Sequence, residues 1–591
     1  SDKAIAKSLN KNYKNNGDNQ VNKVLTELDV RKIRLKNKIT PVIKQIDTLA
    51  GEFDAQTNYL YLTYHGEFHD VKPSEVPIVL ILGSGPYSIG SSVEFDWCAV
   101  TTARQMRKKG QSVAIINSNP ETVSTDYDES DRLYFEQLTL ERVSDIAEFE
   151  NLAGIVVSVG GQVANNLVND LDQMGFKIFG TRPQDIHRAE DRSIFSAMLS
   201  GLNIDQPDWV KANSFESALA FANKIGYPVL IRPSYVLSGS AMNVVRSEEE
   251  LERYLKEAVK LSPDHSVVIS EFITEAKELE IDGVAENGEI CLYVISEHIE
   301  NAGVHSGDAT IVLPPQKLYL ETIRRAKQIS KKIAKALNIS GPFNLQLIAK
   351  DNDLKVIECN VRASRSFPFV SKVTGINFIE VATQVLLGCY VKKQYNTLDL
   401  DYVGVKAPQF SYSRLKGANP VAHVEMASTG EVACLGDNLD EAFYLAMMAS
   451  DIFIKNKKAF ISIGDEKKIK LLPYLKILAD QGWEFICTYG THHFLKENGI
   501  DSACVFKARE EGKTPNTSSI ITQREVGLII NIPRGNASST HETDGFLIRR
   551  LAIDHHIPLV TNVQIAQQLL ISLSKLYDRP LIARSLREIT E

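Results

Sequence analysis

Two alternating apolar runs, residues 344–348 and 354–358, constrain the fold of this chain more than any other feature. The charged residues 351–353 between them are typical of the turn of a β-hairpin. Such a hairpin carries Gln346 and Glu358 to one end of a sheet, where their side-chain oxygens can face a common point. The pattern therefore predicts a site for a hard cation such as Mg²⁺.

Asn360 and Arg362 continue the same alternation beyond Glu358. In extended chain these side chains project to one side, which gives two oxygen ligands followed by a guanidinium. Because Mg²⁺ is normally completed by nucleotide phosphates, an arginine beside it would neutralise charge on a transferring phosphoryl group. The alternative for Glu358 taken alone is a solvated residue at a sheet edge.

A glycine-containing segment upstream supports a nucleotide site. Its residues are Gly303-Val304-His305-Ser306-Gly307-Asp308, which suit neither helix nor strand but allow the backbone to approach a ligand closely. Arg232 lies on a predicted strand before a small-residue loop that reaches Ser240, and such a loop can fold over phosphates. Alternating carboxylates at residues 278–282 could bind ribose hydroxyls, although the pattern by itself favours a solvated face.

Length and composition predict several globular domains in 591 residues, of which 43% are hydrophobic and 24% charged. A net charge of −8 without a long Lys/Arg block indicates no nucleic-acid or membrane partner. Seven widely spaced cysteines favour reduced thiols and a cytoplasmic location. No secretory or membrane segment is recognisable, and Ser1 in place of Met suggests a fragment that could have lost a leader.

Changes in polarity and in the pattern of strand and helix segments along the sequence predict four successive regions of an α/β multidomain protein. Residues 1–75 are polar and helical in character. Residues 76–190 alternate strands at 77–82, 112–117 and 154–159 with helical segments, which predicts a doubly wound parallel sheet. Residues 191–455 are mixed α+β and contain the nucleotide signals. Gly83, Gly85 and Gly90 imitate a dinucleotide fingerprint, but their spacing favours a structural turn.

Residues 456–591 begin a second small parallel α/β domain, with strands near 460–464, 484–488, 527–531 and 558–560. Thr488, Thr491, Lys507 and Asn531 fall near predicted strand ends, where anions bind. Because acidic metal ligands and an evident nucleophile are missing from this pattern, a binding role fits better than catalysis. Capping threonines and a solvated lysine are the alternative interpretation.

Five long segments follow one another in a fixed order: 83–96, 119–126, 232–237, 303–308 and 426–432. Together they resemble carbamoyl phosphate synthetase, and specifically the carboxy-terminal half of its large chain. The resemblance covers essentially the whole chain and implies four parts in order. These are the tail of a helical oligomerisation domain (1–75), a pre-ATP-grasp domain (76–190), an ATP-grasp domain (191–455) and a methylglyoxal-synthase-like allosteric domain (456–591).

By that resemblance, this half uses ATP to phosphorylate carbamate to carbamoyl phosphate. The resemblance implies Mg²⁺, or Mn²⁺, together with K⁺. It assigns Gln346, Glu358 and Asn360 to the metal, Arg232 to the nucleotide phosphates, Glu278 to the ribose, and Gly303, Val304, His305 and Ser306 to the nucleotide. It gives Arg362 and Arg365 the role of stabilising charge on the transferred group. His298 also matches a family position near the site, with a satisfied core histidine as the alternative.

The resemblance also implies partners: carbamate arrives through an internal tunnel from an amino-terminal synthetase half that works with a glutaminase domain or subunit, in an oligomer. Thr488, Thr491, Lys507 and Asn531 match positions that bind a phosphate-bearing effector. Phe506, Arg534 and Gly545 stand where the ammonia-dependent branch would have a Trp and Asn residues, which favours the glutamine-dependent eukaryotic type, with Arg534 joining the effector site. Pyrimidine and arginine biosynthesis both remain open. The alternatives are another ATP-grasp ligase such as a biotin-dependent carboxylase, or a degenerate scaffold.

Overall fold

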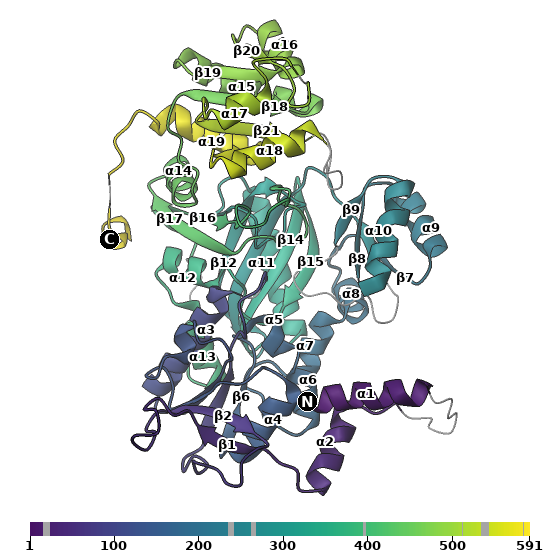
Figure 1. Cartoon of the computed structure of the whole chain (residues 1–591), viewed down its shortest axis with the longest axis vertical. Helices are drawn as coiled ribbons and strands as arrows, with labels where there is room; N and C mark the ends of the chain where they lie inside the picture. Colours follow the sequence, from purple (N-terminus) through teal and green to yellow (C-terminus); the bar gives the residue numbers. More distant parts are fainter. Residues whose placement is uncertain are drawn as a thin grey trace.

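The computed structural model describes residues 1–15, 24–90, 92–233, 242–261, 267–393, 397–510, 512–533, 543–582 and 584–590. Along the chain, these residues build four sheets (Figure 1). The first, third and fourth follow one another from one end of the molecule to the other, and the second lies at the side. Both α/β regions predicted from the strand pattern are present, with an antiparallel region between them. Within the described part of the chain, no helix is long and apolar enough to cross a membrane.

The first sheet has the order β1-β2-β5-β4-β3-β6, and all its pairings are parallel except β1 with β2. Strand β3 lies between β4 and β6 and is buried along its whole length, which explains its unbroken apolar sequence. The doubly wound parallel sheet predicted here is confirmed. Its strands are β1 (Val42–Gln45), β2 (Tyr59–Thr63), β3 (Ile78–Leu82), β4 (Ser112–Ile116), β5 (Arg132–Tyr134) and β6 (Leu152–Val156). Its helices are α3 (Val93–Lys108), α4 (Leu140–Phe149), α5 (Gly161–Asn165), α6 (Val168–Gln173) and α7 (Pro183–Glu190).

The helical character predicted for residues 1–75 holds for α1 (Asp2–Asn15) and α2 (Glu27–Lys36). It is wrong for β1 and β2, which extend the first sheet. In β2, Leu60 and Leu62 are buried while Tyr61 is exposed, so the sequence follows the two-residue period of a strand. Arg34 donates to Asp2 at 3.1 Å, which ties the two helices together.

The second sheet forms a small lobe at the side of the molecule, with the antiparallel order β7-β10-β8-β9 (Figure 1). Arg232 lies on β8, and the loop from 234 to 240 that the sequence predicts to fold over phosphates lies outside the described residues. The elements of the lobe are α8 (Arg192–Gly201), β7 (Trp209–Ala212), α9 (Phe215–Ile225), β8 (Val229–Pro233), β9 (Asn243–Val245), α10 (Glu248–Leu261) and β10 (Val267–Glu271).

The third sheet occupies the middle of the molecule, and its neighbouring strands are antiparallel in the order β15-β14-β11-β12-β13-β16-β17. The hairpin predicted from the two apolar runs is confirmed as β14 and β15, with Gln346 opposite Glu358 and a bulge beside them. The strands are β11 (Lys277–Glu286), β12 (Glu289–Asn301), β13 (Ile311–Leu313), β14 (Gly341–Lys350), β15 (Asp353–Asn360), β16 (Val403–Gln409) and β17 (Gly430–Gly436). The helices are α11 (Leu320–Ala336), α12 (Phe367–Thr374), α13 (Phe378–Leu386) and α14 (Leu439–Ala449).

The solvated face that the sequence alone favoured for the acidic strand is wrong. Glu278, Glu280 and Asp282 on β11 are only 7%, 3% and 0% exposed. Strand β11 lies inside the sheet, between β12 and β14, and Val284 farther along the same face packs in the core that includes α12 and α13. A polar row on an inner strand is buried when other segments cover that face, and strand periodicity cannot reveal this.

The fourth sheet is parallel, with the order β20-β19-β18-β21-β22, and confirms the second small α/β domain. After α19 the chain turns back toward the third sheet, where Arg584 pairs with Asp437 at 2.7 Å. The strands are β18 (Lys458–Ile463), β19 (Glu484–Thr488), β20 (Ala503–Val505), β21 (Leu528–Ile532) and β22 (Leu559–Val560). The helices are α15 (Lys468–Asp480), α16 (Tyr489–Glu497), α17 (Thr517–Thr522), α18 (Asp544–Asp554), α19 (Val563–Leu576) and α20 (Leu586–Thr590).

A glycine between β6 and α5 generates the first prediction. A Cβ at Gly160 would lie 2.3 Å from the carbonyl oxygen of Gly83 and 2.4 Å from that of Leu82, so the backbone would have to move. We expect Gly160→Ala to lower the free energy of unfolding by about 2–3 kcal/mol, measured from denaturant unfolding. Gly201→Ala is the control because a Cβ there meets nothing within 4 Å. Equal stability of the two variants would contradict the close approach.

Candidate active site

The predicted metal residues come together where β14 and β15 lie side by side. Glu358 accepts a hydrogen bond from Asn360 Nδ2 at 2.9 Å, and Gln346 Nε2 donates to Ser306 Oγ at 3.0 Å. Gln346, Glu358 and Asn360 are half-buried, whereas Leu345 and Cys359 beside them are buried. The alternation therefore places the three polar side chains on the partly open face of the hairpin.

The loop 303–308 lies directly beside these residues. Gly303 adopts a φ of +116°, and a Cβ there would lie 2.9 Å from the Phe272 ring. Backbone hydrogen bonds hold the loop in place, because His305 N donates to His423 O at 2.8 Å and Asp308 accepts from Ala427 N at 2.8 Å. The segment predicted to contact a nucleotide is thus fixed next to the hairpin, with Val304 buried and Ser306 touching Gln346.

Arg362 connects the hairpin to the first sheet region. Its Nε donates to Gln162 Oε1 at 2.9 Å, and its Nη2 donates to Asn360 Oδ1 at 3.3 Å. Burial lowers the pKa of Arg362, although Glu358 and Glu190 act in the opposite direction. The guanidinium therefore lies within the field of Glu358, where an additional negative charge would stabilise it.

Arg365 lies beside the loop 303–308, since a Cβ at Gly307 would be 2.8 Å from its Nη1. Its Nη2 pairs with Glu94 Oε1 at 2.6 Å and its Nη1 donates to Ser428 Oγ at 3.1 Å. Glu94 is only 4% exposed, and the arginine holds the pKa of that carboxyl below its usual value despite burial, which raises it. The role predicted for Arg365 on the transferred group remains a prediction, since its guanidinium is engaged by Glu94.

Arg192, the first residue of α8, joins the site and was missed by sequence reasoning. Its Nη1 donates to Ile357 O at 2.6 Å, while its buried Nε has no partner among the described residues. Burial and the nearby Arg232 lower the pKa of Arg192 to about 10, against the attraction of Glu358. Burial likewise lowers the pKa of Arg232. An arginine at the start of a helix usually faces solvent, so the sequence offered no signal.

Three arginines lie near Glu358, where the carboxylates of Glu190 and Glu278 also act, and their guanidinium groups suit a polyphosphate. Arg192, Arg232 and Arg362 are all within the electrostatic reach of this one carboxylate. Guanidinium groups bind phosphate oxygens through paired, charge-assisted hydrogen bonds. The orphaned Nε of Arg192 is a donor available for such a contact.

The donor set also fits Mg²⁺ held partly by phosphates. Glu358 supplies one carboxylate, and Gln346 and Asn360 supply amide oxygens. Searched over the residues with a described structure, the chain shows no cluster of three or more His, Cys, Asp or Glu that could hold a metal. A hard cation here would therefore need oxygens from its nucleotide, which is the usual arrangement for Mg²⁺.

His298 lies deep in the sheet between two carboxylates. Its Nε2 is 3.1 Å from Glu280 Oε1, its Nδ1 is 3.9 Å from Glu278 Oε2, and the residue is 1% exposed. Burial raises the pKa of Glu278 to about 7, although His298 lowers it. Burial works to lower the pKa of His298, but Glu278 and Glu280 raise it overall. His298 is thus a buried histidine with two carboxylate neighbours, and its role at the site remains a prediction.

The residues predicted to bind an effector gather at the carboxyl ends of the fourth sheet. Thr491 Oγ1 accepts from Ile463 N at 3.2 Å, Thr488 Oγ1 donates to Ser462 Oγ at 3.4 Å, and Asn531 Nδ2 donates to Ser462 O at 3.4 Å. Lys507 is more exposed and lies 3.9 Å from Asp544. Arg534 lies outside the described residues.

Two further lysines, missed by sequence reasoning, lie beside this group. Lys468 Nζ donates to Gly490 O at 2.9 Å and Lys467 Nζ donates to Pro533 O at 3.3 Å. Both lie after β18, at the start of α15, in a segment with several lysines. In the sequence, such a segment is typical of an ordinary solvated helix start. Their ammonium groups add positive charge to the same end of the sheet.

Arg549 connects the effector residues to the third sheet region. Its Nη1 donates to Asn531 Oδ1 at 2.7 Å and its Nε donates to Asn419 Oδ1 at 2.9 Å. The side chain is 1% exposed, so this bridge is shielded from water. Asn419 belongs to the same loop as His423, whose carbonyl accepts from His305 in the candidate active site.

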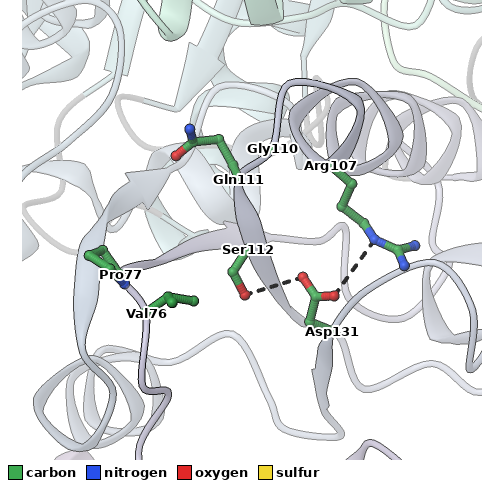
Figure 2. Close-up of a pocket in the computed structure, with 7 residues that line it drawn as sticks. All are labelled: Val76, Pro77, Arg107, Gly110, Gln111, Ser112 and Asp131. Atoms are coloured by element: carbon green, nitrogen blue, oxygen red, sulfur yellow. Dashed lines mark hydrogen bonds and ion pairs between the residues drawn. The ribbon is translucent and has the colours of Figure 1, made fainter.

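A surface cavity of about 520 Å³ lies elsewhere, at the amino-terminal ends of β3 and β4 (Figure 2). Figure 2 shows Asp131 between Ser112, at 3.2 Å, and Arg107, at 3.8 Å. Its charged groups neutralise one another, and ligands of parallel α/β sheets bind at the carboxyl ends of the strands. We therefore assign the active site to the hairpin and its arginines.

Comparisons with known proteins match three domains in order. The carbamoyl phosphate synthase preATP-grasp domain matches residues 75–188, the carbamoyl-phosphate synthase L chain ATP binding domain matches 191–394, and the MGS-like domain matches 470–561. The multifunctional protein URA2 of Saccharomyces cerevisiae is 49% identical over 94% of this chain and 26% of its own length. The human mitochondrial carbamoyl-phosphate synthase [ammonia] is 48% identical over 93% of this chain and 37% of its own length.

The chain is an ATP-grasp protein with a pre-ATP-grasp domain before the ATP-binding domain and an MGS-like domain after it. It belongs to the carbamoyl-phosphate synthase family. It spans between a quarter and about two fifths of the length of the curated relatives that it matches. Relatives named as multifunctional proteins and relatives named as ammonia-type synthases are similar to the chain to nearly the same extent, at 48–50% identity.

Solved structures agree on the fold. The biotin carboxylase domain of Hydrogenobacter thermophilus 2-oxoglutarate carboxylase, in complex with MgADP, ADP and bicarbonate, matches with a TM-score of 0.51 and 16% identity. It covers 63% of this chain and 89% of its own. Biotin carboxylase from Campylobacter jejuni matches with a TM-score of 0.50 and 16% identity, over 64% of this chain and 91% of its own. At this identity, the likeness concerns the fold alone.

The partnerless Nε of Arg192 generates the second prediction. We expect Arg192→Met to weaken binding of ADP about 10- to 100-fold in calorimetry, because a charge-assisted hydrogen bond to phosphate is lost. Arg188→Met is a matched control, since Arg188 pairs with Asp185 at 2.9 Å outside the site. Equal affinities of the two variants would remove Arg192 from the nucleotide site.

Proposed function

We propose that this chain phosphorylates carbamate with ATP and releases carbamoyl phosphate. The observation that carries the proposal is the set of three arginines around Glu358, within a domain of the carbamoyl-phosphate synthase family. The relatives named carbamoyl-phosphate synthase support the same reaction. Because the chain spans only part of these relatives, the reaction proposed is one step of their activity.

The chemistry requires placement more than a base. A carbamate oxygen attacks the γ-phosphorus of ATP, the bond to the β–γ bridging oxygen breaks, and ADP leaves with the electron pair. Since carbamate is already an anion, no proton has to be removed from the nucleophile. Positioned positive charge is the main contribution that an enzyme makes to phosphoryl transfer.

The residues divide this task by position. Arg192 and Arg232 would bind nucleotide phosphates, and Arg362 would stabilise the charge on the transferred group. Glu358, Gln346 and Asn360 would hold Mg²⁺, which supplies charge neutralisation between the phosphates. Mn²⁺ would use the same oxygen ligands, and K⁺ is a further proposed requirement.

The remaining predicted residues would orient the nucleotide. Glu278 would accept hydrogen bonds from ribose hydroxyls, with His298, which is held by Glu280 at 3.1 Å, beside its carboxylate. The loop of Gly303, Val304, His305 and Ser306 would cover the nucleotide, since its backbone is held by His423 and Asp308. Arg365 would contribute positive charge from the Glu94 side of the site.

The proposed partners follow from the substrate. Carbamate is unstable in water, so we propose that an amino-terminal synthetase half supplies it internally, using ammonia from a glutaminase domain or subunit in an oligomer. The glutamine-dependent type and a role in pyrimidine or arginine biosynthesis belong to this proposal. A cytoplasmic location fits the seven free cysteines, although some relatives are mitochondrial.

We also propose that the MGS-like domain binds a phosphate-bearing effector. Thr488, Thr491 and Asn531 lie at the carboxyl ends of its strands, with Lys507 nearby. Positive charge and hydroxyl donors at this edge suit a phosphate group. The bridge from Asn531 through Arg549 to Asn419 would carry the effect toward the nucleotide loop.

Glu358→Gln is the third prediction. Removing the carboxylate should abolish ATP formation from ADP and carbamoyl phosphate, a reverse reaction that needs only this part of the enzyme, while the fold persists. The loss should exceed about 100-fold, since the metal loses its only carboxylate ligand. Glu271→Gln is the control because Glu271 pairs with Lys355 of the same hairpin at 2.8 Å.

The wild-type protein separates the remaining alternatives. ATP formation from carbamoyl phosphate supports the proposed enzyme and excludes the biotin-dependent carboxylase. Folded wild-type protein that binds ADP but forms no ATP would favour a degenerate scaffold. An active Glu358→Gln variant would contradict the metal assignment alone.

The fourth prediction separates effector binding from its effect, with uridine monophosphate as the probe. Lys507→Gln should weaken binding of this probe about 10-fold in calorimetry, because a charged partner of phosphate is lost. Asn419→Ala should bind the probe normally, yet the probe should no longer change the rate of ATP formation, because Arg549 loses its acceptor in the loop. Glu275→Gln breaks another contact between the regions, with Lys470 at 2.8 Å, and should leave the response intact. No binding by the wild type would contradict this effector chemistry.

A further inference from the structure

We propose that Asp282 is a positioning residue that fixes the turn carrying Arg362 and Arg365. Asp282 lies on the inner strand β11 and is 0% exposed. Its carboxylate accepts hydrogen bonds from Ser364 Oγ at 2.7 Å, Ser366 Oγ at 2.6 Å and Asn344 Nδ2 at 2.9 Å. This inference rests on the proposed function, since it concerns the two arginines assigned to phosphoryl transfer.

The two serines stand on either side of Arg365. Their hydroxyls also contact each other at 2.8 Å, so the carboxylate holds both ends of a three-residue turn. Arg365 leaves this turn toward Glu94, while Arg362, two residues earlier, points toward Gln162 and Asn360. Ala363 N donates to Ser158 O at 2.8 Å, which adds a backbone anchor on the other side. The directions of both guanidiniums thus depend on how this turn is held.

The side chain of Ser366 bonds to Asp282 and does not cap its own helix. It precedes α12 at the N-cap position, yet its side chain makes no capping hydrogen bond and its backbone has helical angles of φ −76° and ψ −10°. An N-cap serine ordinarily accepts from the first turn of its helix, as Ser214 does for α9 at 3.3 Å from Ser217 N. Local conflicts of this kind are expected where a site needs the group elsewhere.

The buried carboxylate is itself costly, which indicates a use. Its three donors are neutral hydroxyls and an amide, and no salt bridge to Asp282 is found in the described part of the chain. Burying an anion without a cation is unfavourable unless hydrogen bonds compensate it. An anion can accept from both serines at once, whereas an amide at this position would direct a donor at one of them.

The test compares steady-state kinetics of the full chain in the reverse reaction. We expect Asp282→Asn to lower kcat about 10- to 100-fold while the KM for ADP changes less than about 3-fold, because Arg362 is displaced without loss of ground-state contacts. Glu297→Gln is the matched control. Glu297 is a buried carboxylate on the adjacent strand β12, 1% exposed, which holds Gln316 N and Lys317 N at 2.9 and 2.7 Å. Its variant should lose stability but keep kcat.

Serine variants make the proposal independent of how well Asp282→Asn folds. The double variant Ser364→Ala and Ser366→Ala should reproduce the fall in kcat. The single variant Ser366→Thr should keep most of the wild-type kcat, because it keeps a hydroxyl. Adding the serine changes to Asp282→Asn should cost little more, because the three residues act as one unit.

The outcomes are distinguishable. If the wild type forms ATP, an unchanged kcat in Asp282→Asn would overturn the positioning role and leave the proposed function standing. Additive losses of kcat in the variant that combines all three changes would have the same meaning. If kcat of Glu297→Gln falls as much as kcat of Asp282→Asn, the effect is general destabilisation, and the positioning role is also overturned. A folded wild type that forms no ATP would overturn the proposed function and this inference together.

Discussion

The structure depends on charge that is buried between the third sheet and the elements of the first. Glu278, Glu280 and Asp282 form a row on β11, and the helix α3 brings Glu94 to meet Arg365. Charges removed from water must be paired or hydrogen-bonded. The row on β11 has its partners within the third-sheet region, whereas Arg365 depends on Glu94 of α3. The contact of Arg362 with Gln162 is part of the same requirement. The site is therefore a product of the interface, and neither sheet contains it alone.

This interface explains why the residues of the site break local rules. Gly303 has a left-handed backbone, Ser366 does not cap its helix, and the Nε of Arg192 is buried with no partner among the residues described. Each of these features costs stability in isolation. The buried Nε of Arg192 and the loop fixed at Gly303 are what a preorganised phosphate site requires, because its donors are held in place before the ligand arrives.

The same principle extends to the MGS-like domain. Arg549 and Arg550 of α18 both hold the loop that contains Asn419. Arg549 donates to the side chain of Asn419. Arg550 donates to the carbonyls of Tyr412, Leu415 and Ala418 at 3.1–3.3 Å. That loop in turn holds His305 through the carbonyl of His423. Polar groups buried at an interface have few alternative partners, so a shift in α18 has a physical route to the nucleotide loop.

The sequence by itself determined the hairpin and the two parallel sheets, but not the strands β1 and β2. The alternation around Gln346 and Glu358 specified the hairpin, and buried apolar strands specified the two parallel sheets, because side-chain period is a local property of the backbone. Tertiary structure decided which distant segments pack against each strand and helix. It buried the acidic row of β11, brought Arg192 from a helix start to Glu358, turned Arg365 toward Glu94 and made β1 and β2 part of the first sheet. These outcomes depend on which distant segments cover a given face, and a pattern of neighbours along the chain contains no information about that.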